Sequence, residues 1–100
     1  MSKNKLTFDW DKYNTTKNAL KHGILPFEAE DAFKDRNAII SDDIQHSDKE
    51  ERYILLGKTR KHKVLLIAFT IRERRIRPIS IRQASKKEVN TYHEKETGSS

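Results

Sequence analysis

The order of apolar and polar residues is dominated by one unbroken apolar run, VLLIAFT, at residues 64–70. The run is short and rich in β-branched and aromatic side chains, which predicts a buried central strand. A charged turn, RERR, separates it from a second segment, IRPISIR, which we expect to return as the neighbouring strand. Pro78 lies inside this second segment and cannot donate to a β-ladder. We therefore predict that the second strand is a sheet edge or is bulged at this proline.

The residues before this hairpin predict one short strand, two helices and another strand. Residues 5–10 alternate weakly between apolar and polar types, which is typical of a short edge strand. Asp11 can cap a helix over residues 12–22. Pro26 suits the first turn of a second, shorter helix, and residues 38–41 are apolar enough to form a strand.

Two further elements flank the hairpin on either side. The segment ERYILL, at residues 51–56, has the pattern of a strand, and we expect Gly57 to end it. Ser85 and Glu88 have the spacing of a capping box, which predicts a helix that begins at Lys86.

These elements together predict an α+β fold. We expect a small antiparallel sheet of three to five strands, with two N-terminal helices and one C-terminal helix. All helices would pack on one face of the sheet, which would leave the other face open for the arginines. The length suits one domain, which we place at residues 1–95, followed by a disordered tail at residues 96–100.

Charge is unevenly distributed along the chain, whose formal net charge is +6. Residues 28–51 contain nine acids and three bases, whereas residues 58–82 contain nine bases and one acid. This asymmetry predicts a basic face on the folded domain and favours a polyanionic partner. The alternative is that solvated loops of opposite sign partly neutralise each other.

Several classes of protein are disfavoured by what the sequence lacks. The absence of cysteine excludes disulfides, thiolate metal sites and a cysteine nucleophile. No apolar run approaches the ~20 residues of a membrane helix, so we expect a cytoplasmic protein with no membrane partner. The motifs of common nucleotide-binding, protease and hydrolase sites are missing, and the four histidines are not spaced as metal ligands. We therefore expect no metal and no cofactor.

The basic hairpin suits the metal-free cleavage of RNA, in which the 2′-hydroxyl attacks the neighbouring phosphate. Such a site needs a proton acceptor, a group that assists the leaving 5′ oxygen, and cations that hold the pentacovalent phosphate. Arginine suits the last role because its planar fork binds phosphate oxygens bidentately. Arg72, Arg77 and Arg82 are spread over the hairpin. Arg77 and Arg82 can face one site only if a bulge, for example at Pro78, changes the phase of the strand.

Each of these candidates also has a purely structural interpretation. The arginines can be paired surface residues or contacts for a protein partner. Glu51 can be a base or can orient an arginine, but a surface salt bridge contributing about 0–1 kcal/mol explains it equally well. Lys21 and His22 end the first predicted helix, where a cation is favourable by roughly 0.3–1 kcal/mol. His22 is nevertheless the histidine best placed for proton transfer.

A set of short motifs, in a fixed order, spans the chain from about Leu6 to Tyr92. The set consists of Phe8-Asp9-Trp10-Asp11, Asn18, Lys21-His22-Gly23, Phe27-Glu28-Ala29, Phe33, Asp35, His46, Glu50-Glu51-Arg52, Gly57, Thr70, Arg72, Arg77-Pro78-Ile79-Ser80-Ile81-Arg82, Ala84, Glu88 and Tyr92. In this order the motifs resemble those of the BrnT toxins.

The resemblance implies a RelE-like fold and the toxin of a type II toxin–antitoxin system. It implies a metal-independent endoribonuclease that cleaves mRNA and inhibits translation, with a site built from basic residues of the sheet and a glutamate. Carried over by motif position, the catalytic residues would be Glu51, Arg72, Arg77 and Arg82. The predicted substrate-binding residues are Lys21, His22, Arg52, Arg74 and Arg75.

The resemblance also implies a protein partner. This partner would be a BrnA-like ribbon–helix–helix antitoxin, in a 2:2 complex that binds operator DNA through the antitoxin. The alternative function is a non-catalytic RNA-binding or protein-interaction module that uses the same basic sheet face.

Overall fold

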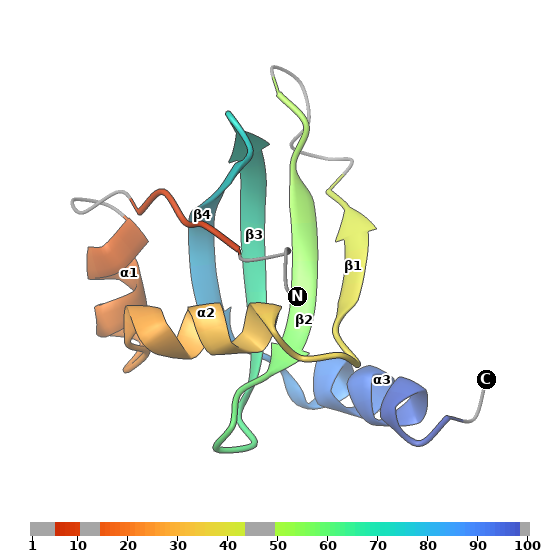
Figure 1. Ribbon diagram of the computed structural model, residues 1–100. Helices are drawn as coiled ribbons and strands as arrows, with labels where there is room; N and C mark the ends of the chain where they lie inside the picture. Colours follow the sequence, from red (N-terminus) through yellow and green to blue (C-terminus); the bar gives the residue numbers. More distant parts are fainter. Residues whose placement is uncertain (1–5, 11–14, 44–49, 99–100) are drawn as a thin grey trace.

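The computed structural model describes residues 6–10, 15–43 and 50–98. Within them the chain forms four strands in one sheet, in the order β1-β2-β3-β4, with every neighbouring pair antiparallel (Figure 1). The α+β fold class is confirmed, with two N-terminal helices and one C-terminal helix. Asp11 and residue 12, the expected cap and start of the first helix, lie outside the described residues. The elements are α1 (Thr15–Lys21), α2 (Pro26–Phe33), β1 (Ile39–Asp42), β2 (Tyr53–Lys58), β3 (Val64–Arg72), β4 (Arg75–Gln83) and α3 (Lys86–Glu96).

The β3–β4 hairpin turns through two residues and contains the predicted bulge. Glu73 and Arg74 both have positive φ, 53° and 66°, as a two-residue type I′ turn requires. Further along, Phe69 pairs with Pro78 whereas Ala68 pairs with Ser80, so one extra residue is inserted into β4. β4 is also the last strand of the sheet. Pro78 has no N–H to donate to a neighbouring strand. The bulge and the edge position of β4 accommodate this missing donor.

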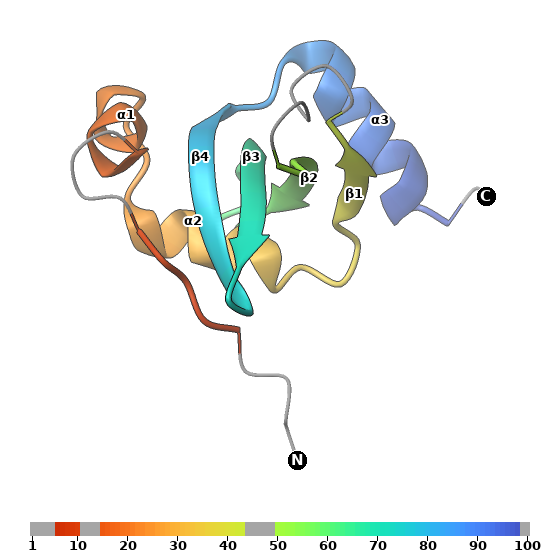
Figure 2. The ribbon, with the colours of Figure 1, turned by 90° about the horizontal axis from the view of Figure 1, so that it is seen from above.

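The helices lie on both faces of the sheet, so the prediction that all helices share one face is wrong. α2 covers one face, where the main core gathers residues such as Ile24, Leu55 and Ile67, and α1 lies beside the outer edge of β4 (Figure 2). α3 lies against the opposite face, at the ends of β1 and β2 (Figures 1 and 2). There Tyr92 is fully buried and packs with Leu56 and Val64 in a second apolar cluster. We call the two sides of the sheet the α2 face and the α3 face.

Gly57 does not end β2, as expected from the sequence, but lies inside it. The strand continues through Lys58, which pairs with Val64. A Cβ atom at Gly57 would lie 2.6 Å from the carbonyl oxygen of Ala32 in α2. The glycine is therefore needed because the end of α2 lies directly over the strand.

Asp35, just after α2, joins three parts of the fold. Its carboxylate accepts hydrogen bonds from the backbone N–H groups of Asn37 and Lys58 and from the hydroxyl of Tyr92, the last at 2.5 Å. Burial opposes ionisation of Asp35, but these hydrogen bonds outweigh it and hold its pKa below the ordinary value. Burial and the bond to Asp35 also raise the pKa of Tyr92. The carboxylate thus fixes α3 relative to the end of α2.

α3 begins and ends with side-chain contacts. Ser85 and Glu88 form the predicted capping box. The helix continues to Glu96, the first residue of the predicted tail, where the carboxylate forms an ion pair with Lys58. Ser99 and Ser100 lie outside the described residues. Across the described ranges, no helix has both the length and the apolar content needed to cross a membrane.

Candidate functional site

The bulge in β4 decides which side chains share a face with Arg77. Arg77 pairs with Thr70 and Arg82 pairs with Leu66. Thr70 and Leu66 are four residues apart on the regular strand β3, so they point to the same face. Arg77 and Arg82 therefore share that face although they are five residues apart, because Ile79 is the extra residue. The phase change anticipated from the sequence is present.

Four arginines of the hairpin lie on the α3 face, three of them toward the β3–β4 turn and Arg82 beside the first turn of α3. Arg72 pairs directly with Arg75, and the position of Arg77 is diagonal to that of Arg72, which corresponds to about 7–8 Å between Cα atoms. Arg82 is four ladder steps from Arg77, or about 13 Å at strand spacing. The cations form a strip along β4 rather than a point cluster. We call this strip, made of Arg72, Arg75, Arg77 and Arg82, the arginine strip.

Three members of the strip are each paired with a carboxylate from a different segment. Arg72 lies 3.4 Å from Glu50, Arg77 lies 3.0 Å from Asp9, and Arg82 lies 2.9 Å from Glu88. The three arginine side chains are still 37–52% exposed. Ion pairs at such exposure contribute about 0–1 kcal/mol, although a bidentate pair such as that of Arg82 with Glu88 contributes more. The strip is therefore ordered by its partners and remains accessible to a competing anion.

The pairs of Arg77 and Arg82 differ in geometry. Arg82 donates from both terminal nitrogens to both oxygens of Glu88, each at 2.9 Å. This pairing lowers the pKa of Glu88 to about 2 and raises that of Arg82. Arg77 donates from Nε and Nη2 to one oxygen of Asp9, at 3.2 and 3.0 Å. Glu88 thus occupies both terminal nitrogens of Arg82, whereas Asp9 binds Arg77 along the side formed by Nε and Nη2.

The comparison with known protein families agrees with this basic face. A family model described as the ribonuclease toxin, BrnT, of a type II toxin–antitoxin system matches residues 10–88. The chain belongs to the BrnT family. RNA is therefore its substrate class, and a protein antitoxin is its partner class. No curated protein matches the chain in a sequence comparison.

The remaining predicted site residues of this BrnT-family chain differ in whether they lie near the arginine strip. Arg52 precedes β2, and strand alternation assigns it to the α3 face with the arginine strip. Arg75 donates to the carbonyl of Phe8 at 3.1 Å, and Arg74 is exposed in the turn. Lys21 and His22 are exposed at the end of α1, which lies beside the outer edge of β4 (Figure 2), and neither side chain forms a hydrogen bond or ion pair with a described residue of the strip.

Glu51 is also separated from the arginines. Its carboxylate accepts a hydrogen bond from the Tyr53 hydroxyl at 2.9 Å, and Tyr53 points to the α2 face. That bond raises the pKa of Tyr53. Among the described residues, the acids that contact the strip are Asp9, Glu50 and Glu88. Of these, only Glu88 has a recognisable role in the sequence, as part of a capping box.

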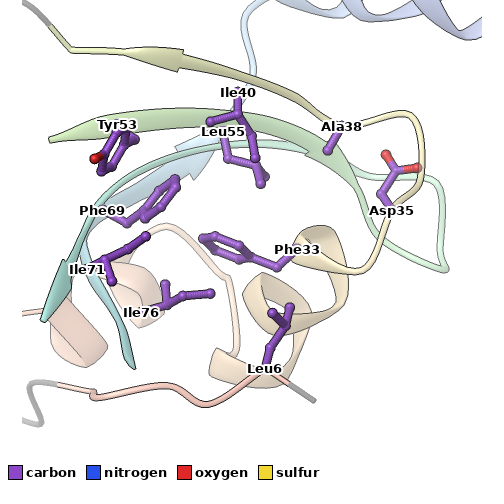
Figure 3. A pocket seen from close by; sticks show the side chains of 10 residues that line it. All are labelled: Leu6, Phe33, Asp35, Ala38, Ile40, Tyr53, Leu55, Phe69, Ile71 and Ile76. Carbon is purple, nitrogen blue, oxygen red and sulfur yellow. The ribbon is translucent and has the colours of Figure 1, made fainter. Parts of the chain in front are cut away.

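A pocket on the α2 face has different chemistry. It has a volume of about 470 Å³ and is lined by aromatic and aliphatic side chains such as Phe33, Tyr53 and Phe69 (Figure 3). Among the described residues that line it, Asp35 is the charged one, so these residues offer no cation to a polyanion. Among the described residues, no group of three or more acidic or histidine side chains could hold a metal ion.

Proposed function

We propose that this BrnT-family chain is a metal-independent, RelE-like endoribonuclease that cleaves mRNA on the arginine strip and thereby inhibits translation. The observation that supports the proposal most directly is the bulge at Ile79, which aligns Arg77 and Arg82 on one accessible face. RNA carries a phosphate at every nucleotide, and a line of guanidinium groups suits a backbone that passes over the sheet.

The proposed reaction is transesterification, which releases the downstream RNA fragment with a free 5′-hydroxyl. The 2′-oxygen forms a bond to phosphorus, the bond from phosphorus to the 5′ oxygen breaks, and a 2′,3′-cyclic phosphate and a 5′-hydroxyl result. Arg72 and Arg77, whose Cα atoms are about 7–8 Å apart as diagonal neighbours, would hold the oxygens of the pentacovalent phosphate. Preorganised cations of this kind stabilise charge that develops in the transition state.

Proton transfer needs an acid and a base near these arginines. Glu50, which lies 3.4 Å from Arg72, is better placed than Glu51 to accept the proton of the 2′-hydroxyl. The leaving 5′ oxygen would take its proton from water while a guanidinium group stabilises it. Arg75 and Arg82 would contact flanking phosphates, and Arg52 would extend the basic surface toward β2.

The proposed partner is a BrnA-like ribbon–helix–helix antitoxin, which would form a 2:2 complex and bind operator DNA through its own domain. An acidic antitoxin segment that covers the arginine strip would neutralise it, and opposite charge would speed the encounter. Action on mRNA implies a cytoplasmic location.

The test is cleavage of a defined RNA, free and in translating ribosomes, with EDTA present. Arg77→Ala should reduce the rate about 100-fold or more, as is typical for loss of a transition-state contact. Arg36→Ala is the matched control, because Arg36 is an exposed arginine in the turn after α2. Loss of wild-type cleavage in EDTA would refute metal independence, and equal rates for the two variants would refute the strip as the site.

A further inference from the structure

The segment that carries Asp9 is fixed against the edge strand β4. Ile76 donates its N–H to the carbonyl of Thr7 at 2.9 Å and accepts from the N–H of Asp9 at 2.7 Å. Phe8, between them, packs edge-on against Phe33 of α2, with ring centroids 5.3 Å apart. Because successive side chains of an extended segment point in opposite directions, Asp9 is directed to the α3 face.

The next residue adds a second anchor. The indole Nε1 of Trp10 donates to the carboxylate of Glu30 in α2 at 2.8 Å. Asp9 therefore lies between two side chains that are held by α2, and its carboxylate has a defined position. From there one oxygen, Oδ2, accepts from both Nε and Nη2 of Arg77. In the part of the chain that the structure describes, Nη1 of Arg77 has no hydrogen-bond partner.

We propose that Asp9 is a positioning residue, which holds the guanidinium group of Arg77 by its Nε side and leaves the other donors for the scissile phosphate. This inference rests on the proposed function. An unrestrained arginine loses rotamer entropy when it is immobilised, whereas a fixed guanidinium group is already oriented when the transition state forms. The carboxylate acts through Arg77 and does not itself touch the substrate.

The pair formed by Arg82 shows why the geometry matters. Glu88 occupies both terminal nitrogens of Arg82, which are the donors that a phosphate would use for a bidentate contact. Asp9 occupies Arg77 from the side with one oxygen only. Of the two arginines, Arg77 is therefore the one whose counter-ion orients it without filling its fork.

The experiment compares kcat and KM for cleavage of a defined RNA by wild type, Asp9→Asn and Asp9→Ala. We expect kcat to fall at least about tenfold in both variants, with KM changed less than about threefold, because orientation is needed mainly in the transition state. Asp42→Asn is the charge control, since Asp42 is an exposed acid on β1, and it should match wild type.

Two further comparisons distinguish the positioning of Arg77 from simple support of the fold and from competition with the phosphate. Phe8→Leu loosens the same segment without removing the carboxylate, so a purely structural role predicts that its kcat falls as far as that of Asp9→Asn at equal loss of thermal stability. An unchanged kcat for Asp9→Asn, or a lowered KM with a raised kcat, would overturn the inference, and the second result would make Asp9 a competitor of the phosphate. An inactive wild type would overturn the proposed function as well.

Discussion

The ion pair between Arg82 and Glu88 makes a prediction about stability that can be worked from its geometry. Each oxygen of Glu88 accepts from one terminal nitrogen of Arg82 at 2.9 Å, and Oε1 also accepts from the N–H of Ser85 at 2.8 Å. Glu88→Gln keeps an acceptor for the capping box, in which glutamine also serves. It removes the charge that makes the pair with Arg82 strong. The substitution therefore isolates the ionic part of the interaction.

The lowered pKa of Glu88 sets an upper limit for the ionic contribution of this pair to the free energy of unfolding. The fall from the ordinary 4.5 to about 2, at about 1.36 kcal/mol for each pH unit, corresponds to at most about 3.4 kcal/mol. The side chains of Arg82 and Glu88 are 46% and 29% exposed, and solvent screening reduces the value of such pairs. We expect Glu88→Gln to lower the free energy of unfolding by about 1–2 kcal/mol at pH 7.

The direction of the pKa shift determines how the stability difference between wild type and Glu88→Gln changes with pH. The folded-state pKa of Glu88 is depressed, so its contribution is fully present above the unfolded-state pKa and is lost as the pH falls through the folded-state value. The gap between wild type and Glu88→Gln should be constant from pH 7 to about 5 and should close between about pH 5 and 2.

Urea unfolding, followed by far-UV circular dichroism and by the fluorescence of Trp10, measures the gap at each pH. Glu73→Gln is the control, because Glu73 is an exposed acid in the hairpin turn without an ion pair to any described residue. It should match wild type throughout. A gap that persists unchanged at pH 2.5, or no gap at pH 7, would refute the assigned role of the ion pair.

Two other substitutions test the packing of the helices on the sheet. Gly57→Ala places a methyl group 2.6 Å from the carbonyl oxygen of Ala32, a backbone atom that cannot move without shifting α2, and should destabilise the fold by about 1–3 kcal/mol in urea unfolding. A loss below about 0.5 kcal/mol would show that the helix adjusts freely. Tyr92→Phe removes the buried donor to Asp35 and should lower the free energy of unfolding by about 1–2 kcal/mol in calorimetry at pH 7. Tyr53→Phe is the matched control, because the hydroxyl of Tyr53 donates to an exposed carboxylate. It should change the free energy of unfolding by less than about 0.5 kcal/mol. Equal losses for the two variants would contradict the role of the buried bond.

The local features of the fold could be predicted because each depends on neighbouring residues. The apolar run predicted β3, the capping box of Ser85 and Glu88 predicted the start of α3, and Pro26 marked the start of α2. Proline chemistry alone predicted the bulge or edge at Pro78. In each case one stretch of sequence contains both the signal and its physical cause.

Features that depend on contacts between distant segments were not predictable in this way. The sequence around Gly57 resembles the end of a strand. The glycine is instead required because Ala32 in α2 lies directly against it. The position of α3 depends on the apolar cluster that Tyr92 forms with residues of the sheet such as Leu56 and Val64, and nothing in the helix itself indicates the face on which it packs. The acids that pair with the arginine strip were not predictable for the same reason, because each comes from a different segment of the chain.

The order of residues in β4 nevertheless contained a signal for the site. The dipeptide Ile-Arg occurs at Ile76-Arg77 and again at Ile81-Arg82, five residues apart. In a regular strand this spacing would direct one isoleucine to the core and the other away from it. Both isoleucines are on the α2 face, where Ile81 is 1% exposed and Ile76 packs against the same core. One inserted residue is needed to bury both, and the same insertion brings both arginines to the opposite face. The apolar core and the arginine strip therefore impose the same bulge, so a single irregularity of β4 serves stability and the proposed chemistry together.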